Sequence, residues 1–196
     1  KRRSPFLAIV CTLTCAAALV PASFGCADPV DPTLYTLTDA PKLEAFANQE
    51  VTVGTRTVLA GADGYLEKAC GSLDCHGNEG RPLRIYSQRG LRKRGANNFT
   101  AAAATTDEEI LYNYFSVICL EPEIMSQVAT SEPKGANPER LLFVRKPLAG
   151  EELTEPHKGG KIIGGTADDS YRCLVDWLGG VSNVDACAAA MIAIPP

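Results

Sequence analysis

The sequence predicts a mainly α-helical domain with long loops and minor β structure. Three observations support this prediction. A helix-start signal stands at residues 106–109, and apolar residues recur at helical spacing after it. Shorter helical patterns follow near residues 168–178 and 183–193, and stretches rich in proline and glycine separate the patterns. The 196 residues allow one domain of ordinary size once a targeting segment is removed.

Residues 1–26 have the layout of a secretory signal. Basic residues at the start precede an apolar run over 6–20, which is short for a membrane span. Two ways of processing fit this segment. It resembles a bacterial lipoprotein signal with Cys26 as the lipidated residue, and ordinary cleavage before Asp28 is the alternative. We therefore expect the protein in the periplasm or cell envelope, or else secreted. Its only expected attachment to a membrane is a lipid anchor on Cys26.

The next stretch, residues 27–45, contains three prolines and predicts a linker, which places the domain at 46–196. The start of the folded part has a mixed pattern. Helix-forming residues fill 42–49, whereas β-branched residues alternate over 51–58 as in a short strand. A helical turn is expected next, running into Cys70, and an extended piece is expected to end at Gly90.

The clearest helix begins at Thr106. This side chain can cap exposed backbone amides while Glu109 reaches back to the Thr106 amide. The apolar residues that follow, among them Tyr114 and Val117, share one face. Pro122 starts a new segment, and a turn or helix is expected between Pro138 and Pro147.

The last part of the chain predicts two short helices after a loop. The loop covers 149–167 and contains His157. Asp168 or Asp169 can cap the first helix, and Gly179–Gly180 can end it. The second helix is expected to begin at Ser182 or Asn183.

Charge and cysteine content restrict the function classes. The net charge is −4 with both signs interspersed, so the chain lacks the basic face that nucleic-acid binding needs. In an exported protein, cysteines need bonded partners or burial. Cys173 and Cys187 flank the turn between the last two helices, so we expect a disulfide between them. Cys119 is expected to be a buried thiol.

Cys70, Cys75 and His76 lie together in the segment KACGSLDCHG. One interpretation is a small disulfide with an incidental histidine. A zinc site is a second, but neighbouring side chains project in different directions and do not suit one tetrahedral ion. The third is one covalent haem c, because two thiols followed directly by histidine are the attachment pattern that delivers an imidazole to the iron. The usual spacing leaves two residues between the cysteines, and this segment has four.

The order of several segments strengthens the haem interpretation. The cysteine segment is followed by LRIY at 83–86, KP at 146–147, HKGG at 157–160 and WL at 177–178. Over about residues 66–180 this series resembles the cytochrome c-like domains of planctomycete-type exported proteins, and lipoprotein-like myxobacterial relatives. Lys158 departs from the family pattern, which often has glycine there. The resemblance implies a small helical haem domain and a ligand role for His157.

A haem that only transfers electrons has both axial positions of its iron filled. His76 is the expected proximal ligand, and the sixth ligand must come from the remaining histidine and methionines: His157, Met125 or Met191. We predict His157, with Met125 as the alternative and an open position as a further one. Trp177 is expected to pack on the porphyrin. Arg84, with Arg81 and the basic cluster 89–94, is expected to neutralise its propionates or to steer a partner.

The predicted function is electron transfer by an exported monohaem c-type cytochrome-like protein, with redox proteins of the cell envelope as partners. On this interpretation the protein is an electron carrier and not an enzyme. The alternative is a haem-free, disulfide-stapled envelope lipoprotein that acts as a binding or structural module. An open-site haem peroxidase or sensor is a minor third hypothesis.

Overall fold

The computed structural model describes residues 39–93, 103–149 and 156–195. The predicted signal segment, Cys26 and its lipidation, and most of the predicted linker lie outside these residues. The described part confirms the mainly α prediction, with seven α-helices and one two-stranded sheet. The helices are α1 (Leu43–Phe46), α2 (Ala62–Cys70), α3 (Asp107–Ile118), α4 (Pro122–Ala129), α5 (Leu142–Arg145), α6 (Asp169–Leu178) and α7 (Val184–Ala193). None of the described helices is long and apolar enough to cross a bilayer.

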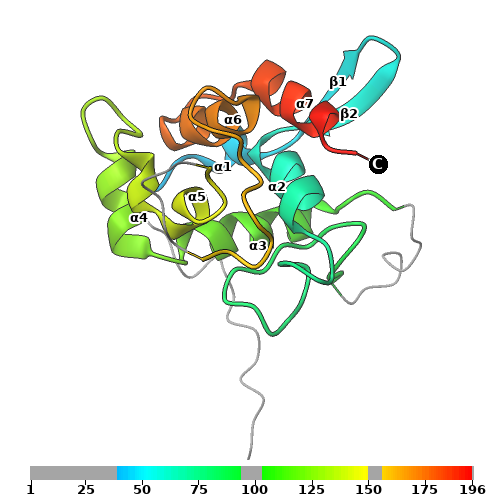
Figure 1. The fold of residues 1–196 in the computed structure, drawn as a ribbon, viewed down its shortest axis with the longest axis horizontal. Helices are drawn as coiled ribbons and strands as arrows, with labels where there is room; N and C mark the ends of the chain where they lie inside the picture. The colour runs from blue at the N-terminus through cyan, green and yellow to red at the C-terminus, as the bar shows by residue number, and fades with distance from the viewer. Residues whose placement is uncertain (1–38, 94–102, 150–155, 196) are drawn as a thin grey trace, which may run out of the picture. The chain divides into compact units, whose positions relative to one another are not determined.

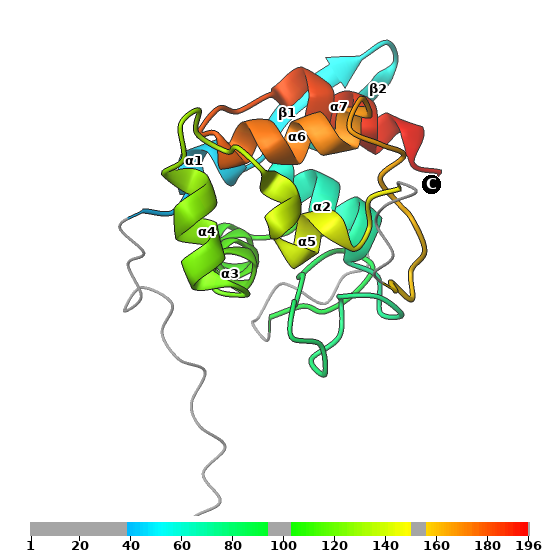
Figure 2. The same cartoon turned by 60° about the vertical axis from the view of Figure 1, so that its left-hand side comes forward.

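Helix α2 lies in the middle of this arrangement. Figures 1 and 2 show α6 and α7 side by side above α2, with α3 and α4 on the opposite side. An aromatic cluster joins these layers: the ring of Phe46 lies 4.8 Å from that of Trp177 and 5.7 Å from that of Tyr114, measured between centroids. All three side chains are buried, so α1, α3 and α6 share one core.

The mixed pattern at the start of the domain resolves into a short helix and a hairpin. After α1, strand β1 (Gln49–Val53) pairs antiparallel with β2 (Arg56–Ala60), with Val51 opposite Val58. The two-residue connection begins with Gly54 at a φ of 62°, a conformation that glycine adopts without steric cost. The residues that alternate over 51–58 therefore lie mostly in the two strands, whereas the helix-forming residues before them form only the single turn of α1.

The predicted helix starts are confirmed. Thr106 accepts a hydrogen bond from the backbone amide of Glu109 at 3.2 Å, and the Glu109 carboxylate accepts one from the Thr106 amide at 3.0 Å. Asp168 caps α6 by accepting from the Ser170 amide at 2.9 Å. Asn183 caps α7, and Pro122 occupies the first turn of α4.

Three expectations differ from the structure. The residues before Gly90 form an isolated bridge between Tyr86 and Leu91 rather than a strand, because this segment wraps around the end of α2. Residues 41–45, expected as linker, belong to the packed body: the Tyr114 hydroxyl donates to the Pro41 carbonyl at 2.7 Å. Cys119 is exposed, not buried, because it lies at the C-cap of α3, just after the last turn of the helix.

A disulfide joins α6 to α7. The predicted bond between Cys173 and Cys187 is present, with Cα atoms 4.7 Å apart, and both cysteines are buried. It closes a loop over a sequence separation of 14. Closing a loop of that size stabilises a fold by about 3 kcal/mol, chiefly by restricting the unfolded chain.

We expect the Cys173→Ala/Cys187→Ala variant to lose about 3 kcal/mol of unfolding free energy, measured by urea denaturation. Reducing the disulfide of the wild-type protein should lower the urea concentration at the unfolding midpoint about as much as the double substitution does. The exposed Cys119 offers a matched control, and Cys119→Ala should leave the midpoint close to that of the wild type. An unchanged midpoint on reduction would contradict this assignment of stability to the disulfide.

Candidate functional site

The segment after α2 folds back on the helix end. The His76 amide donates to the Cys70 carbonyl at 2.9 Å, and the amides of Cys75 and Gly77 both donate to the Ser72 carbonyl. The Ile85 amide then donates to the His76 carbonyl at 2.9 Å. These bonds turn residues 71–77 into a compact loop, so the longer spacing between the two cysteines is taken up without moving His76 away from the end of α2.

Three glycines make this loop possible. A Cβ atom on Gly77 would lie 2.1 Å from the Gly71 carbonyl oxygen and 2.8 Å from the Gly90 Cα. A Cβ on Gly90 would lie 2.0 Å from the same oxygen. Gly71 has a φ of −82°, which any residue can adopt. Glycine is therefore needed at these positions for the close packing of backbone on backbone and not for conformational freedom at Gly71.

An arginine holds the second cysteine in place. The Arg81 Nε donates to the Cys75 carbonyl at 3.0 Å, and its Nη2 donates to the Asp74 carbonyl at 3.3 Å. Arg84 is exposed, and its Nε donates to the Arg81 carbonyl at 3.3 Å. The two arginines therefore stabilise the loop backbone at the edge of the site, and Arg84 does not line the cavity described below.

Both histidines of the chain have the same hydrogen-bonding arrangement. His76 Nδ1 lies 3.0 Å from the Leu83 carbonyl oxygen, and His157 Nδ1 lies 2.7 Å from the Gly160 carbonyl oxygen. A carbonyl oxygen only accepts, so the proton of each neutral ring sits on Nδ1 and Nε2 keeps its lone pair. Histidines that bind metals are commonly oriented in this way.

Burial lowers the pKa of His76, and the nearby His157 and Arg81 lower it further, although the bond to Leu83 acts in the opposite direction. A lowered pKa keeps the imidazole neutral at physiological pH. A neutral ring with an unprotonated Nε2 is the form that can coordinate a metal ion.

The two imidazole rings lie close together in nearly parallel planes. Their centroids lie 6.2 Å apart and their planes differ by 13°. Two bonds of about 2.1 Å from nitrogen to a first-row metal, plus about 1.1 Å from each nitrogen to its ring centre, span about 6.4 Å. The spacing of the rings is thus close to that of two imidazoles on opposite sides of one metal ion.

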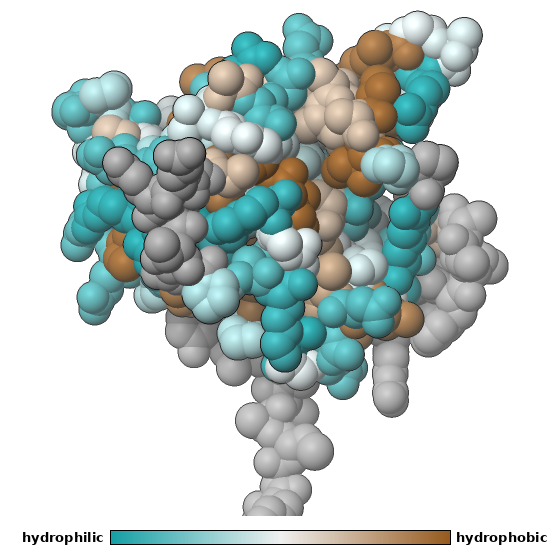
Figure 3. Space-filling model, viewed as in Figure 1, coloured by the Kyte–Doolittle hydropathy of each residue, from teal (hydrophilic) through white to brown (hydrophobic). Residues whose placement is uncertain are grey.

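A cavity of about 230 Å³ contains both rings, and we call it the histidine cavity. Cys70 also lines it, and most of its other wall is apolar, with residues from α2, α5 and the loops: Leu66, Leu83, Leu120, Leu142, Phe143 and Pro147. Figure 3 shows hydrophobic residues on this face in the region between α2 and α5. The cavity therefore offers a mainly apolar environment with two imidazoles and a thiol, and Lys146 also lines it.

Cys70 and Cys75 are both free thiols in the structure. Burial raises the pKa of the Cys70 thiol to about 12, and the neighbouring Cys75 contributes to this shift. The described part of the chain has no group of three or more His, Cys, Asp or Glu residues placed to hold a metal ion. The Cys70 thiol and the two imidazoles line the histidine cavity, whereas Cys75 is not among the residues that line it.

The other candidates for the axial position lie elsewhere. Met125 is fully buried on α4 and does not line the histidine cavity, and Met191 lines a different cavity. Trp177 also stays outside the wall. It packs behind Phe143, with ring centroids 6.2 Å apart, and its indole donates to the Lys42 carbonyl at 3.3 Å. Of the candidates for the sixth ligand, the structure brings only His157 to His76.

One member of the basic cluster at 89–94, Arg92, is bound to residues outside the histidine cavity. Arg92 donates through Nε and Nη2 to the buried Glu109 carboxylate, at 3.0 Å for each bond, and to the carbonyls of Ala103 and Ala104. Arg94 lies outside the described residues. The expectation that the cluster as a whole serves a cofactor therefore does not suit Arg92, whose guanidinium neutralises Glu109.

The sequence pattern did not indicate the whole apolar wall of the cavity, nor the packing role of Gly77 and Gly90. Leu83 and Pro147 stand in the segments that carry the family resemblance, so that signal pointed to part of the wall. The contribution of Phe143 had no local signal, because a buried phenylalanine on a short helix is ordinary core. In comparisons with protein-family models, curated proteins and solved structures, nothing significant matches this chain.

Proposed function

We propose that this chain is an exported electron-transfer protein that carries one covalent haem c in the histidine cavity, as a cytochrome c-like domain does. Cys70 and Cys75 would hold the porphyrin through thioether bonds. His76 and His157 would bind the iron from its two faces. The haem supplies the one-electron couple, and its partners would be redox proteins of the cell envelope.

One observation carries this proposal. The ring centroids of two histidines from distant segments lie 6.2 Å apart in one mainly apolar cavity, and the Nδ1 of each ring is hydrogen-bonded to a backbone carbonyl. An incidental pair of loop histidines has no reason to match the span of a bis-imidazole site and to share a tautomer. The free thiol of Cys70 in the same wall, and Cys75 beside it, support a covalently attached porphyrin over a bare metal ion.

The residues present fit such a group. The wall is mainly apolar, as a porphyrin face requires, and the Leu83 and Gly160 carbonyls fix the orientation of the two rings. The volume of about 230 Å³ is below the range of about 300–1,000 Å³ that encloses drug-sized ligands. We therefore expect one edge of the macrocycle to stay exposed, which suits electron exchange with a partner.

The test is to produce the protein together with haem-maturation machinery. We expect a Soret band, a covalent-haem stain after denaturation, and a mass increase equal to one haem on the peptide that contains residues 68–80. The Cys70→Ala/Cys75→Ala variant should lose the stain. The Cys173→Ala/Cys187→Ala variant, which removes the same number of cysteines, should keep it.

Other results would favour the rival hypotheses. A colourless, unmodified protein with Cys70 bonded to Cys75 would indicate the haem-free, disulfide-stapled module. A haem-containing wild type that binds carbon monoxide or cyanide rapidly would indicate an open position, as in a peroxidase or sensor, and would contradict ligation by His157.

A further inference from the structure

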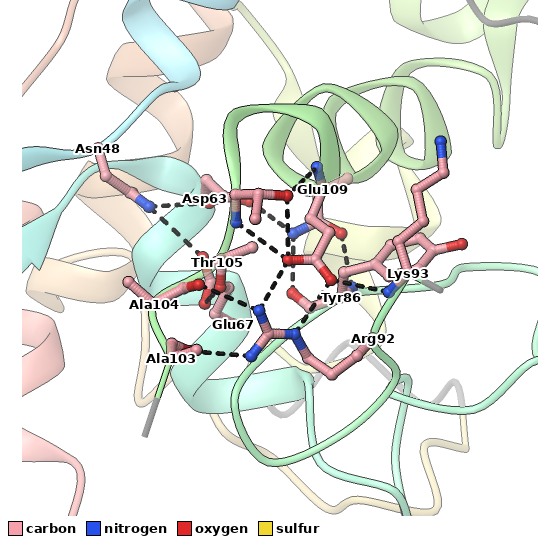
Figure 4. A network of polar contacts seen from close by, with 12 residues as sticks. Asn48, Asp63, Glu67, Tyr86, Arg92, Lys93, Ala103, Ala104, Thr105 and Glu109 are labelled. Carbon is pink, nitrogen blue, oxygen red and sulfur yellow. Dashed lines mark hydrogen bonds and ion pairs between the residues drawn. The ribbon is translucent and has the colours of Figure 1, made fainter. Parts of the chain in front are cut away.

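Helix α2 has the histidine cavity on one side and a second cavity, of about 340 Å³, on another. Leu66 and Cys70 line the first cavity, and Glu67 lines the second. Asp63 lies one turn before Glu67 on the same helix and is fully buried. Figure 4 shows the two carboxyl groups within a network of polar side chains. We call Asp63 and Glu67 the acid pair.

One amide joins the two carboxyl groups of the acid pair. Asn48 Nδ2 donates to Asp63 Oδ2 at 2.8 Å and lies 3.4 Å from Glu67 Oε1. Asn113 Nδ2 donates to the other Asp63 oxygen at 2.8 Å, and the Thr105 hydroxyl donates to Glu67. Because both carboxyl groups lie within reach of one nitrogen, two negative charges here would repel each other strongly.

The cations around the acid pair are occupied. Arg92 is committed to Glu109, the third carboxylate of the network. Lys93 pairs with Glu108, and Lys68 and Arg56 donate to backbone carbonyls at the end of α7. Arg89 stands at the edge of the second cavity. No cation among the residues described contacts either carboxyl of the acid pair.

Asp63 is fully buried and Glu67 is half-buried, and no cation among the described residues contacts either carboxyl, so the acid pair favours holding one shared proton at neutral pH. Burial raises the pKa of Glu67 to about 9, and the charge of Asp63 and the bond to it contribute to this shift. Burial also raises the pKa of Asp63, although hydrogen bonds from Glu67, Asn113 and Asn48 oppose the shift. Both shifts favour one proton held by the acid pair at neutral pH.

We propose that the acid pair is a redox-linked proton site, which loses its proton to water when an electron leaves the haem and regains one when an electron returns. This inference rests on the proposed function. The electron goes to the one-electron acceptor of the partner, and the O–H bond of Glu67 breaks to leave a carboxylate. Glu67 can exchange its proton with solvent because the exposed Gln88 and Arg89 line the same cavity.

The physical reason is electrostatic. The acid pair and the wall of the histidine cavity lie on neighbouring faces of α2, and a helix with its side chains, about 10–12 Å across, sets the scale of the distance between them. One added positive charge at that distance favours the ionised pair. We expect the acid dissociation constant of the pair to be about tenfold larger in the oxidised than in the reduced protein.

The experiment measures the midpoint potential of the haem-loaded protein from pH 6 to pH 11, a range chosen to bracket the expected ionisation near pH 9. The wild-type potential should fall as pH rises through this ionisation and level off on either side. Glu67→Gln, which preserves the shape and the bond from Thr105, should abolish the fall. Glu123→Gln on the exposed face of α4 is the matched control and should retain it.

A Glu67→Gln potential that still falls with pH as in the wild type would overturn the inference. Infrared spectroscopy supplies a readout that needs no electron transfer. At pH 7 the wild type should show the carbonyl absorption of a neutral carboxylic acid, and Glu67→Gln should lack it; absence of that band in the wild type would overturn the shared proton. If the protein carries no haem, the proposed function fails, whereas the infrared band still decides on the acid pair.

Discussion

Replacing His157 by alanine is expected to give a haem protein that binds carbon monoxide rapidly in its reduced form, whereas the wild type should not do so on the same timescale. The reason is that His157 is the residue that the structure places opposite His76, with ring centroids 6.2 Å apart. Removing the imidazole leaves one face of the iron without a protein ligand. Stopped-flow absorbance in the Soret region measures the effect.

Substitution by methionine makes a second, graded test of the same position. His157→Met should raise the midpoint potential by about 0.1 V or more, within the range of about 0.8 V over which axial ligands tune haem. Methionine with histidine gives a higher potential than two histidines. Spectroelectrochemistry on the purified variant gives this value directly.

The Met125→Leu variant distinguishes iron ligation by His157 from ligation by Met125. Met125 is fully buried and lies outside the histidine cavity, so a change to leucine should cost less than about 1.5 kcal/mol and leave the spectrum unchanged. If Met125→Leu opened the iron to carbon monoxide and His157→Ala did not, the ligand assignment would be wrong.

Gly77→Ala is expected to destabilise the protein by about 3 kcal/mol or more, at the upper end of the cost of overpacking. The added methyl group would meet the Gly71 carbonyl oxygen at 2.1 Å, and neither backbone can move without disturbing the bonds that form the loop. Urea denaturation of the haem-free protein measures the stability. The yield of covalent haem should fall as well, because the loop presents both cysteines and His76.

Gly80, three residues after Gly77, provides a matched control. A Cβ on Gly80 would have Asn78 Oδ1 as its nearest neighbour, at 3.4 Å, and Gly80 is exposed. Gly80→Ala should therefore change the unfolding free energy by no more than about 0.5 kcal/mol. Equal losses in the two variants would contradict the assignment of the cost to the contact with the Gly71 carbonyl.

Local signals in the sequence predicted much of the helical structure correctly. The capping box at Thr106, the aspartate cap of α6 and the start of α7 at Asn183 each depend on residues within four positions of one another. The disulfide between Cys173 and Cys187 was also predictable, because a short turn brings the two helices together. Cys119 was wrongly expected to be buried, since it lies at the C-cap of α3, just after the last turn of the helix.

The residues alone indicated only the cysteine–histidine segment of the candidate site, and the resemblance added His157. The adjacency of Cys75 and His76 is a property of the sequence alone, and haem attachment can be inferred from that adjacency without knowledge of the fold. Three residues were candidates for the position opposite His76: His157, Met125 and Met191. The choice among them depends on the packing of α4, α5, α7 and the loop before α6. No local pattern encodes that choice.

The sequence by itself determined where the helices start, which cysteines could pair and which histidine accompanies the thiols, because these features arise from neighbours along the chain. Only the tertiary structure decided that His157 lies close to His76, that Gly71, Gly77 and Gly90 meet, and that Asp63 and Glu67 share one amide of Asn48. Each of these contacts joins residues that are not neighbours in sequence. Their positions follow from burying one common apolar core, to which every helix contributes.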